Sequence, residues 1–336
     1  MPKFPLPFEP IRETLYTPDE LFAGFDPAKP RSYAETRDFR IYRAYVGSGK
    51  YRPREYFTSM MQAMHDNSIL QSVNDYLQTS SSKAVAMMGG HAMQRDTPGY
   101  GQVARLSRAL ARRDFLMLSG GGPGAMEATH LGALLRYEPD SALDDALAHL
   151  AKHPHLPHHA SHVVDMNGHP DWRIIDEVQE WFGAGWEIVQ RVAQRGESLA
   201  IPTWLYGHEP TSPFATRIAK YFQNSIREDG LVSVATHGII FAEGRAGTLQ
   251  EIFQDATQNY YRTFGSFSPM VFLAGEYWTK TIPAVPTLQA LLTPDDFEKY
   301  VLVSDDLDQI VEFLSSYSHE TPAERMDQYL DGGAAR

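Results

Sequence analysis

The chain has 336 residues, of which 43% are hydrophobic and 21% charged, and its formal net charge is −12. This length can bury a large core without a metal, and the lack of cysteine excludes disulfides and cysteine nucleophiles. The acidic balance argues against nucleic-acid binding, which needs a basic face. The N-terminal stretch MPKFPLPFEP lacks the apolar segment of a signal peptide, and no run of about 18 apolar residues predicts a membrane span. We therefore expect a cytoplasmic protein.

Residues 1–82 are predicted to form an N-terminal arm and a helical extension. Residues 1 to about 50 are rich in proline, aromatic and charged residues and have no sustained period. The proline-aromatic run Phe4–Phe8 suggests an extended arm that packs on the body or on a neighbouring subunit. Residues 54–80 have apolar residues at helical spacing, which predicts a helix whose methionine and aromatic stripe is packed against the protein.

The first half of the body contains a strand that runs into a glycine turn. Residues 84–88 are predicted as the first strand, 99–113 as a helix and 115–118 as the second strand. Three glycines follow the second strand, and a helix is predicted from Gly124 to about Tyr137. This order points backbone N–H groups and a helix dipole at an anion, and glycine lets a ligand approach the backbone closely.

Residues 138–171 are expected to be an insert outside the core. Seven of the thirteen histidines lie between His149 and His169. A bound metal is one interpretation, but the histidine spacing is irregular, prolines interrupt it, and no cysteine accompanies it. Composition of this kind therefore favours a solvent-exposed insert over a metal site.

The second half of the body repeats the pattern of strand, glycine turn and helix at Glu243–Thr248. The alternation predicts a three-layer, Rossmann-like α/β domain with a mostly parallel sheet over residues 83–318, followed by a polar tail at 319–336. Ligands of such sheets bind at the carboxyl ends of the strands. The elements predicted here are helices at 172–195, 214–228, 249–260, 284–293 and 305–317, and strands at 198–202, 237–242, 269–273 and 300–303.

A dinucleotide site is one interpretation of the first glycine turn, because Gly120, Gly122 and Ala125 fit G-x-G-x-x-G/A. That motif expects an acidic residue about 20 positions on, at the end of a strand. Glu138 and Asp140 are near that distance but follow a helix and a proline, and the turn follows the second strand rather than the first. The sequence therefore disfavours NAD and FAD, and we expect no cofactor.

Five segments together resemble the Lonely-guy (LOG) family of nucleotide phosphoribohydrolases, whose members are often mislabelled lysine decarboxylases. Within that family the chain more closely resembles the bacterial pyrimidine/purine 5′-nucleotide nucleosidases. The resemblance covers roughly residues 83–275. Its segments are MGGH at 88–91, GGGPGAMEA at 120–128, HEPTSP at 208–213, SIRED at 225–229 and HGIIFAEGRAGTLQE at 237–251.

The second turn departs from the family signature P-G-G-x-G-T-x-x-E at two positions. Glu243 replaces the proline and Arg245 replaces the second glycine, whereas the closing G-T-x-x-E is intact. The backbone of this turn is still expected to cradle an anion. Arg245 can add a charge-assisted contact to phosphate or reach a neighbouring subunit.

The resemblance implies hydrolysis of the N-glycosidic bond of nucleoside 5′-monophosphates, giving free base and ribose 5-phosphate. It assigns the catalytic roles to Glu251 and Arg227. Such a reaction builds positive charge on the sugar, which a carboxylate can stabilise while it activates water. Without the resemblance, Glu251 is equally an acid complementing a helix dipole, and Arg227 a surface ion.

The remaining site residues are expected to bind substrate or phosphate, with a pocket wall at His208 and Glu209. A non-catalytic nucleotide sensor is the alternative function. A pyridoxal-phosphate decarboxylase is disfavoured, because Lys220 is the only lysine between 210 and 255 and nothing near it resembles a Schiff-base site. The resemblance also implies a homo-oligomer. The substrate-binding residues expected are Gly89, Gly90, His91, Gly120, Gly121, Gly122, Gly124, Met126, Glu127, Gly244, Arg245, Gly247 and Thr248.

Overall fold

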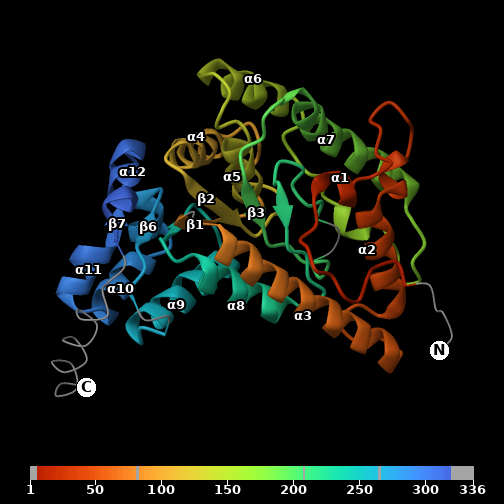
Figure 1. Ribbon diagram of the computed structural model, residues 1–336. Coiled ribbons are helices and arrows are strands. Elements are labelled where there is room, and N and C mark those ends of the chain that lie inside the picture. The colour runs from red at the N-terminus through yellow and green to blue at the C-terminus, as the bar shows by residue number, and fades with distance from the viewer. Residues whose placement is uncertain (1–5, 81–82, 207–208, 264–265, 319–336) are drawn as a thin grey trace.

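The computed structural model describes residues 6–80, 83–206, 209–263 and 266–318. Its centre is a sheet of order β4-β3-β2-β1-β5-β6-β7, in which all neighbouring strands are parallel (Figure 1). Strand order reverses between β1 and β5, and such a reversal opens a crevice at the carboxyl ends. The strands are β1 (Lys83–Met88), β2 (Phe115–Ser119), β3 (Ser198–Ala200), β4 (Arg217–Ile218), β5 (Ile239–Phe241), β6 (Met270–Phe272) and β7 (Val301–Val303).

Helices cover both faces of the sheet, which confirms the predicted α/β class (Figure 1). Ala86 and Met88 of β1 face a core shared with α3, α8 and α9, whereas Val85 and Met87 face a core shared with α4 and α5. Strands buried on both faces are continuously apolar, which is why these runs were recognisable. The helices are α1 (Pro18–Leu21), α2 (Arg37–Ser48), α3 (Tyr56–Thr79), α4 (Pro98–Arg112), α5 (Ala125–Leu134), α6 (Asp140–Leu150), α7 (Trp172–Arg191), α8 (Asn224–Val234), α9 (Ala246–Tyr260), α10 (Ala284–Leu291), α11 (Pro294–Tyr300) and α12 (Leu307–Ser316).

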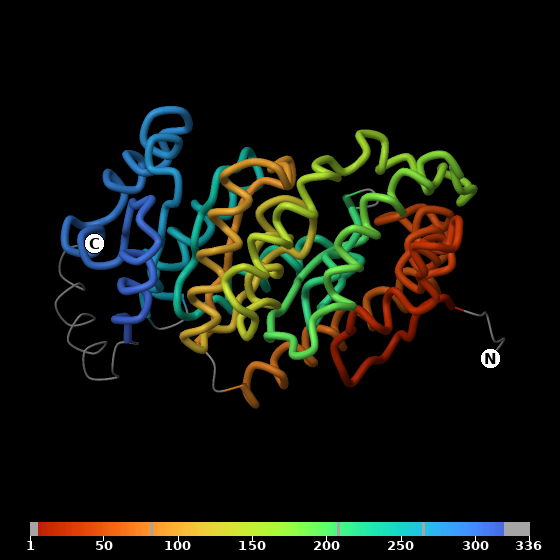
Figure 2. Tube along the Cα trace, turned by 90° about the horizontal axis from the view of Figure 1, so that it is seen from above, coloured from red at the N-terminus to blue at the C-terminus, as the bar shows by residue number. Residues whose placement is uncertain are grey.

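The N-terminal region contains α2, which the sequence analysis did not predict. The Thr36 hydroxyl caps its start by accepting from the Phe39 N–H, and Gly49 ends it with a φ of 107°. The helix buries Tyr42 and Tyr45 against the body. Helices α1 and α2 lie at the opposite end of the molecule from α10–α12 (Figure 2). Phe4 and Pro5 of the predicted arm lie outside the described residues.

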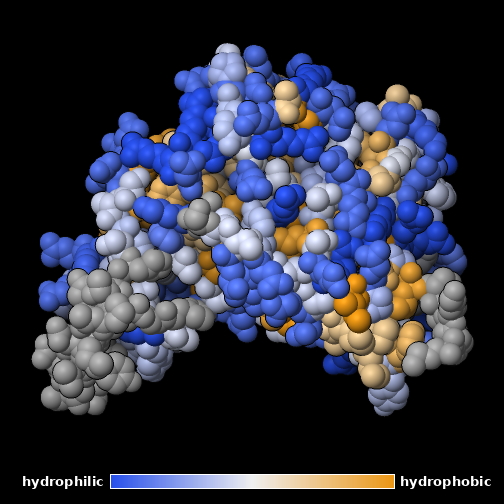
Figure 3. Space-filling model, viewed as in Figure 1, coloured by the Kyte–Doolittle hydropathy of each residue, from blue (hydrophilic) through white to orange (hydrophobic). Residues whose placement is uncertain are grey.

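Helix α3 is confirmed, but the prediction that its methionine and aromatic stripe is packed is wrong within this chain. Tyr56, Phe57, Met60 and Met64 are exposed near the N-terminal half of the helix. The buried face is largely polar there and becomes apolar only further along the helix. Apolar surface gathers at this end of α3 (Figure 3). A stripe of this kind on a chain surface commonly marks a contact site.

The predicted helix at 214–228 is wrong in its first half, which contains the two-residue edge strand β4 and no helix. The backbone groups of Ile218 pair with those of Tyr16 in an antiparallel bridge, with N–H to O distances of 2.9 Å in both directions. Helix α8 begins only at Asn224. The N-terminal region thus supplies long-range contacts that override the local helical spacing. Helix α11 likewise has no counterpart among the predicted elements.

The expectation that residues 138–171 lie outside the core is also wrong. Helix α6 buries Leu143, Ala146 and Leu150 in one core, and Val163 is buried in the other. Several histidines pair with carboxylates, such as His149 Nε2 with a Glu187 oxygen at 3.3 Å. In the described ranges no three histidine or carboxylate side chains gather as a metal would require. Nor does any described helix combine the length and apolar content needed to cross a bilayer.

Candidate functional site

The two glycine turns meet at the end of β1, where the strand order reverses. The Gly90 N–H donates to the Glu243 carbonyl at 2.8 Å, and the Gly90 carbonyl accepts from the Ala125 N–H at 3.3 Å. A Cβ at Gly89 would lie 2.7 Å from the Cβ of Ala125 and 3.1 Å from that of Ala242. Glycine is therefore required there for the turns to close on one another. Both turns lie at the carboxyl end of β1.

The first turn, Gly120–Gly124, is braced from below by a buried hydrogen-bond network. The Ser119 Oγ accepts from the Gly121 N–H at 3.1 Å and donates to the Met126 carbonyl at 3.1 Å. His130 Nε2 lies 2.8 Å from the same Oγ, and His130 Nδ1 lies 2.9 Å from the Ser198 Oγ. Burial lowers the pKa of His130 to about 3, so the ring is neutral.

Two side chains from distant elements lie against the glycines of the first turn. A Cβ at Gly120 would overlap Nη2 of Arg227, and a Cβ at Gly122 would lie 3.1 Å from Oε2 of Glu209. The thioether of Met126 covers the same two glycines. Gly120 and Gly122 thus make room for the Arg227 guanidinium, the Glu209 carboxyl group and the Met126 thioether.

Gly121 and Gly124 serve a different purpose in the first turn. Both have positive φ, at 70° and 73°, a backbone conformation that residues with side chains rarely adopt. A Cβ at Gly121 would lie 2.7 Å from the Cβ of Ala200, and one at Gly124 would overlap the Gly90 carbonyl. These glycines therefore fix the path of the turn.

The second turn carries the N-terminus of α9, a helix of 15 residues. Thr248 packs over Gly244, whose carbonyl accepts from the Tyr277 hydroxyl. Arg245 is the exposed residue at the N-cap, and no atom of the described residues lies within 4 Å of a Cβ built on Gly247. The turn therefore presents free space and a positive helix end, the arrangement that binds phosphate groups.

Glu251 and Arg227 lie together beside the first glycine turn, and burial makes the Glu251 carboxyl a weaker acid than usual. Arg227 Nη1 lies 3.9 Å from Glu251 Oε1, and the two side chains are only 11% and 15% exposed. Burial raises the pKa of Glu251 to about 7, while Arg227 lowers it and Glu228 raises it. Arg227 is fixed by an Nε bond to the Ile201 carbonyl at 3.0 Å. A carboxyl poised near neutral pH suits general base catalysis.

Glu209 belongs to a loop that is tied to the first turn. The Ser212 N–H donates to the Gly121 carbonyl at 2.9 Å, and the Thr211 hydroxyl accepts from Lys220 Nζ at 2.8 Å. Burial raises the pKa of Glu209, whereas His91, Arg227 and Lys220 lower it. His91 itself is exposed at the end of β1. His208, expected in the pocket wall, lies outside the described residues.

The loop is anchored by a buried ion pair that sequence reasoning missed. Lys220 Nζ lies 2.7 Å from Asp38 Oδ1, with both side chains essentially inaccessible, and Trp204 Nε1 donates to the same oxygen at 2.9 Å. Asp38 comes from α2, more than 160 residues away from either partner. No local pattern marks Asp38, since it resembles any acid in the first turn of a helix.

Glu127, expected to bind substrate, is instead part of a buried ion pair. Arg95 Nη2 and Nε donate to its two carboxylate oxygens at 2.6 and 2.9 Å, and the Tyr100 hydroxyl donates at 2.9 Å. The guanidinium also stacks on the Trp181 ring, 3.7 Å from the centroid. Both carboxylate oxygens therefore have protein donors, so a structural role explains Glu127.

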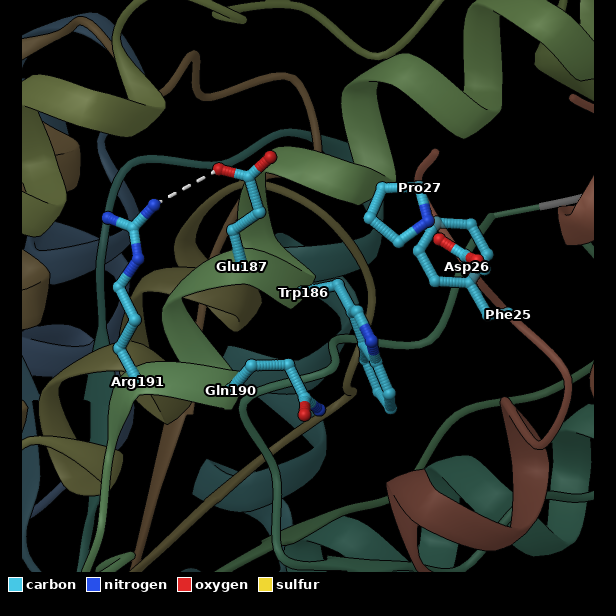
Figure 4. A pocket seen from close by; sticks show the side chains of 7 residues that line it. All are labelled: Phe25, Asp26, Pro27, Trp186, Glu187, Gln190 and Arg191. Carbon is cyan, nitrogen blue, oxygen red and sulfur yellow. Dashed lines mark hydrogen bonds and ion pairs between the residues drawn. The ribbon is translucent and has the colours of Figure 1, made fainter. Parts of the chain in front are cut away.

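A cavity of about 620 Å³ opens beside the second turn. It includes Gly90, Gly244 and Arg245 of the predicted site, together with Gln102 of α4 and Tyr277. A separate hollow of about 560 Å³ lies between α7 and the N-terminal region, with a Glu187–Arg191 ion pair at its edge (Figure 4). None of the predicted site residues that the structure describes lines that hollow. The cavity at the second turn lies at the carboxyl ends of β1 and β5, and Arg227, Glu251 and the glycines of the first turn are not among the residues that line it.

Comparisons with known proteins give structural similarity only. No protein-family model matches the chain, and no curated protein matches it. The molybdenum cofactor binding protein from Rippkaea orientalis is 12% identical, with a TM-score of 0.41 over 71% of this chain and 98% of that one. The Moco carrier protein from Chlamydomonas reinhardtii is 14% identical, with a TM-score of 0.37 over 70% and 99%. The protein TM1055 is 16% identical, with a TM-score of 0.39 over 70% and 99%.

Proposed function

We propose that this protein hydrolyses the N-glycosidic bond of nucleoside 5′-monophosphates, releasing the base and ribose 5-phosphate. The observation that carries the proposal is Glu251. Its buried carboxyl group, with a pKa of about 7, lies 3.9 Å from Arg227, whose guanidinium packs against Gly120 of the first glycine turn. A helix N-terminus that can hold phosphate is therefore combined with an acid that can act on the sugar.

The phosphate is proposed to bind at the second turn, where the first N–H groups of α9 and the Arg245 guanidinium meet the 620 Å³ cavity. A phosphate there completes hydrogen bonds that the first helical turn cannot make internally. Arg245 replaces a family glycine and adds a positive charge to the turn. The ribose then extends from the second turn toward Glu251.

Glu251 stabilises the positive charge that develops on the sugar ring and accepts a proton from the attacking water. Its carboxylate form is the active one, and Arg227 favours that form. Arg227 also supplies donors for ribose hydroxyls or phosphate. Lys220 does not suit a Schiff-base mechanism, because its amino group is held by Asp38 and Thr211.

A product assay tests the proposal. The protein is incubated with AMP, GMP, CMP, UMP and cytokinin ribotides, and free base is quantified by chromatography. Release of base from at least one nucleotide over many turnovers is expected. Binding of a nucleotide by calorimetry without any release would instead support the sensor function and reject the hydrolase.

We also infer that the chain assembles with a second copy of itself, as the family resemblance implies. The exposed stripe of Tyr56, Phe57, Met60 and Met64 on α3 is the apolar surface that supports this proposal. Sedimentation analysis is expected to give at least a dimer, and Met60→Glu combined with Met64→Glu should shift it toward monomer. If the mass of this double variant is unchanged, the stripe is not part of the interface.

A further inference from the structure

We propose that Asp66 of α3 is a positioning residue for Arg227, because its carboxylate fixes the start of the helix that carries this arginine. The assignment rests on the proposed nucleotide hydrolysis and adds to it a residue from the N-terminal extension, which the family resemblance does not cover. The motivating observation is that Asp66 accepts hydrogen bonds from the two backbone N–H groups directly before α8. Arg227 is the fourth residue of that helix.

The bonds from the backbone to Asp66 are short and buried. The Gln223 N–H donates to Asp66 Oδ2 at 2.8 Å, and the Phe222 N–H donates to Asp66 Oδ1 at 3.0 Å. The Asp66 side chain has no exposed surface. Gln223, the N-cap residue of α8, makes no capping bond with its own side chain. The carboxylate from α3 therefore supplies the acceptor and the negative charge that favour a helix N-terminus.

The Asp66 carboxylate is itself held by a buried chain of side chains. His65 Nδ1 lies 3.0 Å from Asp66 Oδ1, and His65 Nε2 lies 2.9 Å from the Tyr16 hydroxyl oxygen. A neutral imidazole with its proton on Nδ1 can donate to Asp66 and accept from Tyr16 at the same time. The backbone of Tyr16 pairs with Ile218 of the edge strand β4. The position of Asp66 is thus tied to the sheet.

Apolar packing holds the second half of α8 more than its first turn. The buried residues of this helix, Leu231 and Val232, lie in the second half. In the first turn, Ile226 is only partly buried. Two glutamines of α9 bond to carboxylates further along α8, but these bonds are exposed. Loss of the Asp66 carboxylate should therefore let the first turn, residues 224–227, move while the second half stays packed.

A movement of this turn would change the geometry of Arg227 at the site. Residue 227 lies four positions after Gln223, which is about one helical turn, so its Cα follows any movement of the bonded N–H groups. Its Nη1 lies 3.9 Å from Glu251 Oε1, and its guanidinium packs against Gly120. Misplacing a substrate-orienting group by about 1 Å can lower a rate by about 10²-fold. Asp66, which is fully buried, therefore acts on the reaction through Arg227.

The titration of Glu251 tests the assignment without relying on turnover. Arg227 lowers the pKa of Glu251 and Glu228 raises it, so an arginine that moves away should shift the titration to higher pH. The titration is followed by NMR of protein labelled with ¹³C at the glutamate carboxyl, and Glu251→Gln identifies the signal. Asp66→Ala is expected to raise the midpoint by about a few tenths of a pH unit. In a protein that already carries Arg227→Ala, the same change should cause no shift.

Activity gives the second measurement, on the nucleotide cleaved fastest in the panel. Asp66→Ala should lower kcat/KM by about 10–100-fold, but by less than about threefold in the Arg227→Ala background. Asp66→Asn, which keeps an oxygen acceptor without the charge, should recover part of the loss. Circular dichroism verifies folding, and Asp66→Asn replaces Asp66→Ala in both measurements if the alanine variant does not fold.

The matched control is Asp171→Ala, which removes a carboxylate from the start of α7. Asp171 accepts from two backbone N–H groups there, at 3.0 and 3.2 Å, as Asp66 does before α8. Helix α7 carries none of the predicted site residues. This variant should therefore change neither kcat/KM nor the titration of Glu251.

The outcomes separate this assignment from the proposed function. A loss of kcat/KM that persists in full without Arg227, or an unchanged titration of Glu251 in a folded Asp66 variant, would overturn the role of Asp66 and leave the hydrolase intact. No cleavage of any nucleotide by the unaltered protein would overturn the hydrolase. The titration of Glu251 then determines alone whether Asp66 positions Arg227.

Discussion

Glu127 and Glu251 occupy similar places in the sequence but have opposite surroundings. Each lies early in a helix that follows a strand and a glycine turn, at the third position of α5 and the sixth of α9. Both carboxylate oxygens of Glu127 accept short bonds from Arg95, and a third bond comes from Tyr100. Glu251 has one distant cation and a pKa raised to about 7.

The difference teaches that strand, glycine turn and helix place an acid near the crevice without deciding what it does. The role of the acid depends on which side chains from elsewhere in the chain contact it. Arg95 lies in the loop before α4, and its charge-assisted bonds occupy every oxygen of Glu127. Arg227 is held back by the Ile201 carbonyl, and the oxygens of Glu251 stay available. A carboxyl group that is buried, but whose oxygens are not all occupied by protein donors, is the kind that can take part in a reaction.

Glu251→Gln should give the largest effect and is the sharpest test of this contrast. The change keeps the shape of the side chain but removes the carboxylate that stabilises the sugar cation and accepts the proton. We expect kcat to fall by about 10²–10⁴-fold. Nucleotide affinity by calorimetry and the midpoint of thermal unfolding should change little, because the side chain has only a 3.9 Å ionic contact. A large loss of stability with modest loss of rate would contradict the comparison.

Glu127→Gln should have the reverse signature. It leaves the Arg95 guanidinium buried without its counter-charge, and breaking a buried pair in this way costs about 3–5 kcal/mol. The free energy of unfolding, measured with urea, should fall by about that amount. At low temperature, the molecules of this variant that remain folded should have most of the kcat of the parent protein. Loss of activity in a variant with unchanged stability would place Glu127 in the reaction after all.

The fold was largely predictable because its strands are buried on both faces. The apolar runs of β1, β2, β5 and β6 stand out from their surroundings, and the glycine turns locate their carboxyl ends. Strand β4 was not predictable, because it has only two residues and one of them, Ile218, pairs with Tyr16 from near the other end of the chain. Helix α2 had a signal that was overlooked, namely the Thr36 cap, the Gly49 stop and apolar residues at helical spacing between them.

Part of the candidate site was predictable from the turns that follow the strands. Gly90, Gly120 and Gly244 were identified from their positions after strands, and the structure brings these three segments together. The pair Arg227 and Glu251, which only the family resemblance singled out, also lies together. The loop anchor of Asp38 and Lys220 was not identifiable, because its members are 182 positions apart and neither has a distinctive neighbourhood in the sequence. Whether protein donors occupy both oxygens of a carboxylate likewise depends on the folded structure and cannot be read from the sequence.

Asp255 tests whether burial alone makes an acid functional, since it lies one turn beyond Glu251 on the same helix. Burial raises its pKa well above the ordinary range, and its Oδ2 has no hydrogen-bond partner among the described residues. The native state therefore holds a proton that the unfolded chain releases, so stability falls as the pH rises above the ordinary carboxyl range. Asp255→Asn should remove this fall and stabilise the protein by about 1–2 kcal/mol at pH 8 relative to pH 5.

The measurement is urea unfolding of the parent and variant at both pH values, alongside kcat on the preferred nucleotide. We expect kcat to stay within about threefold, because Asp255 faces the core rather than the crevice. An equal pH dependence for the two proteins would show that Asp255 does not titrate differently on folding. A large loss of kcat would give it a part in the reaction and weaken the distinction between buried and functional acids.

Glu228→Gln should have the smallest effect and refines the account of Glu251. The negative charge of Glu228 raises the pKa of Glu251, so its removal should move the acid limb of the kcat/KM profile to lower pH. A shift of about a few tenths of a pH unit is expected, because charge pairs near the surface are worth about 0.2–1 kcal/mol. Glutamine can keep the contacts to Tyr206 and Gln250, which isolates the charge. A shift to higher pH would mean that another group sets the limb, since removing a neighbouring negative charge can only make Glu251 more acidic.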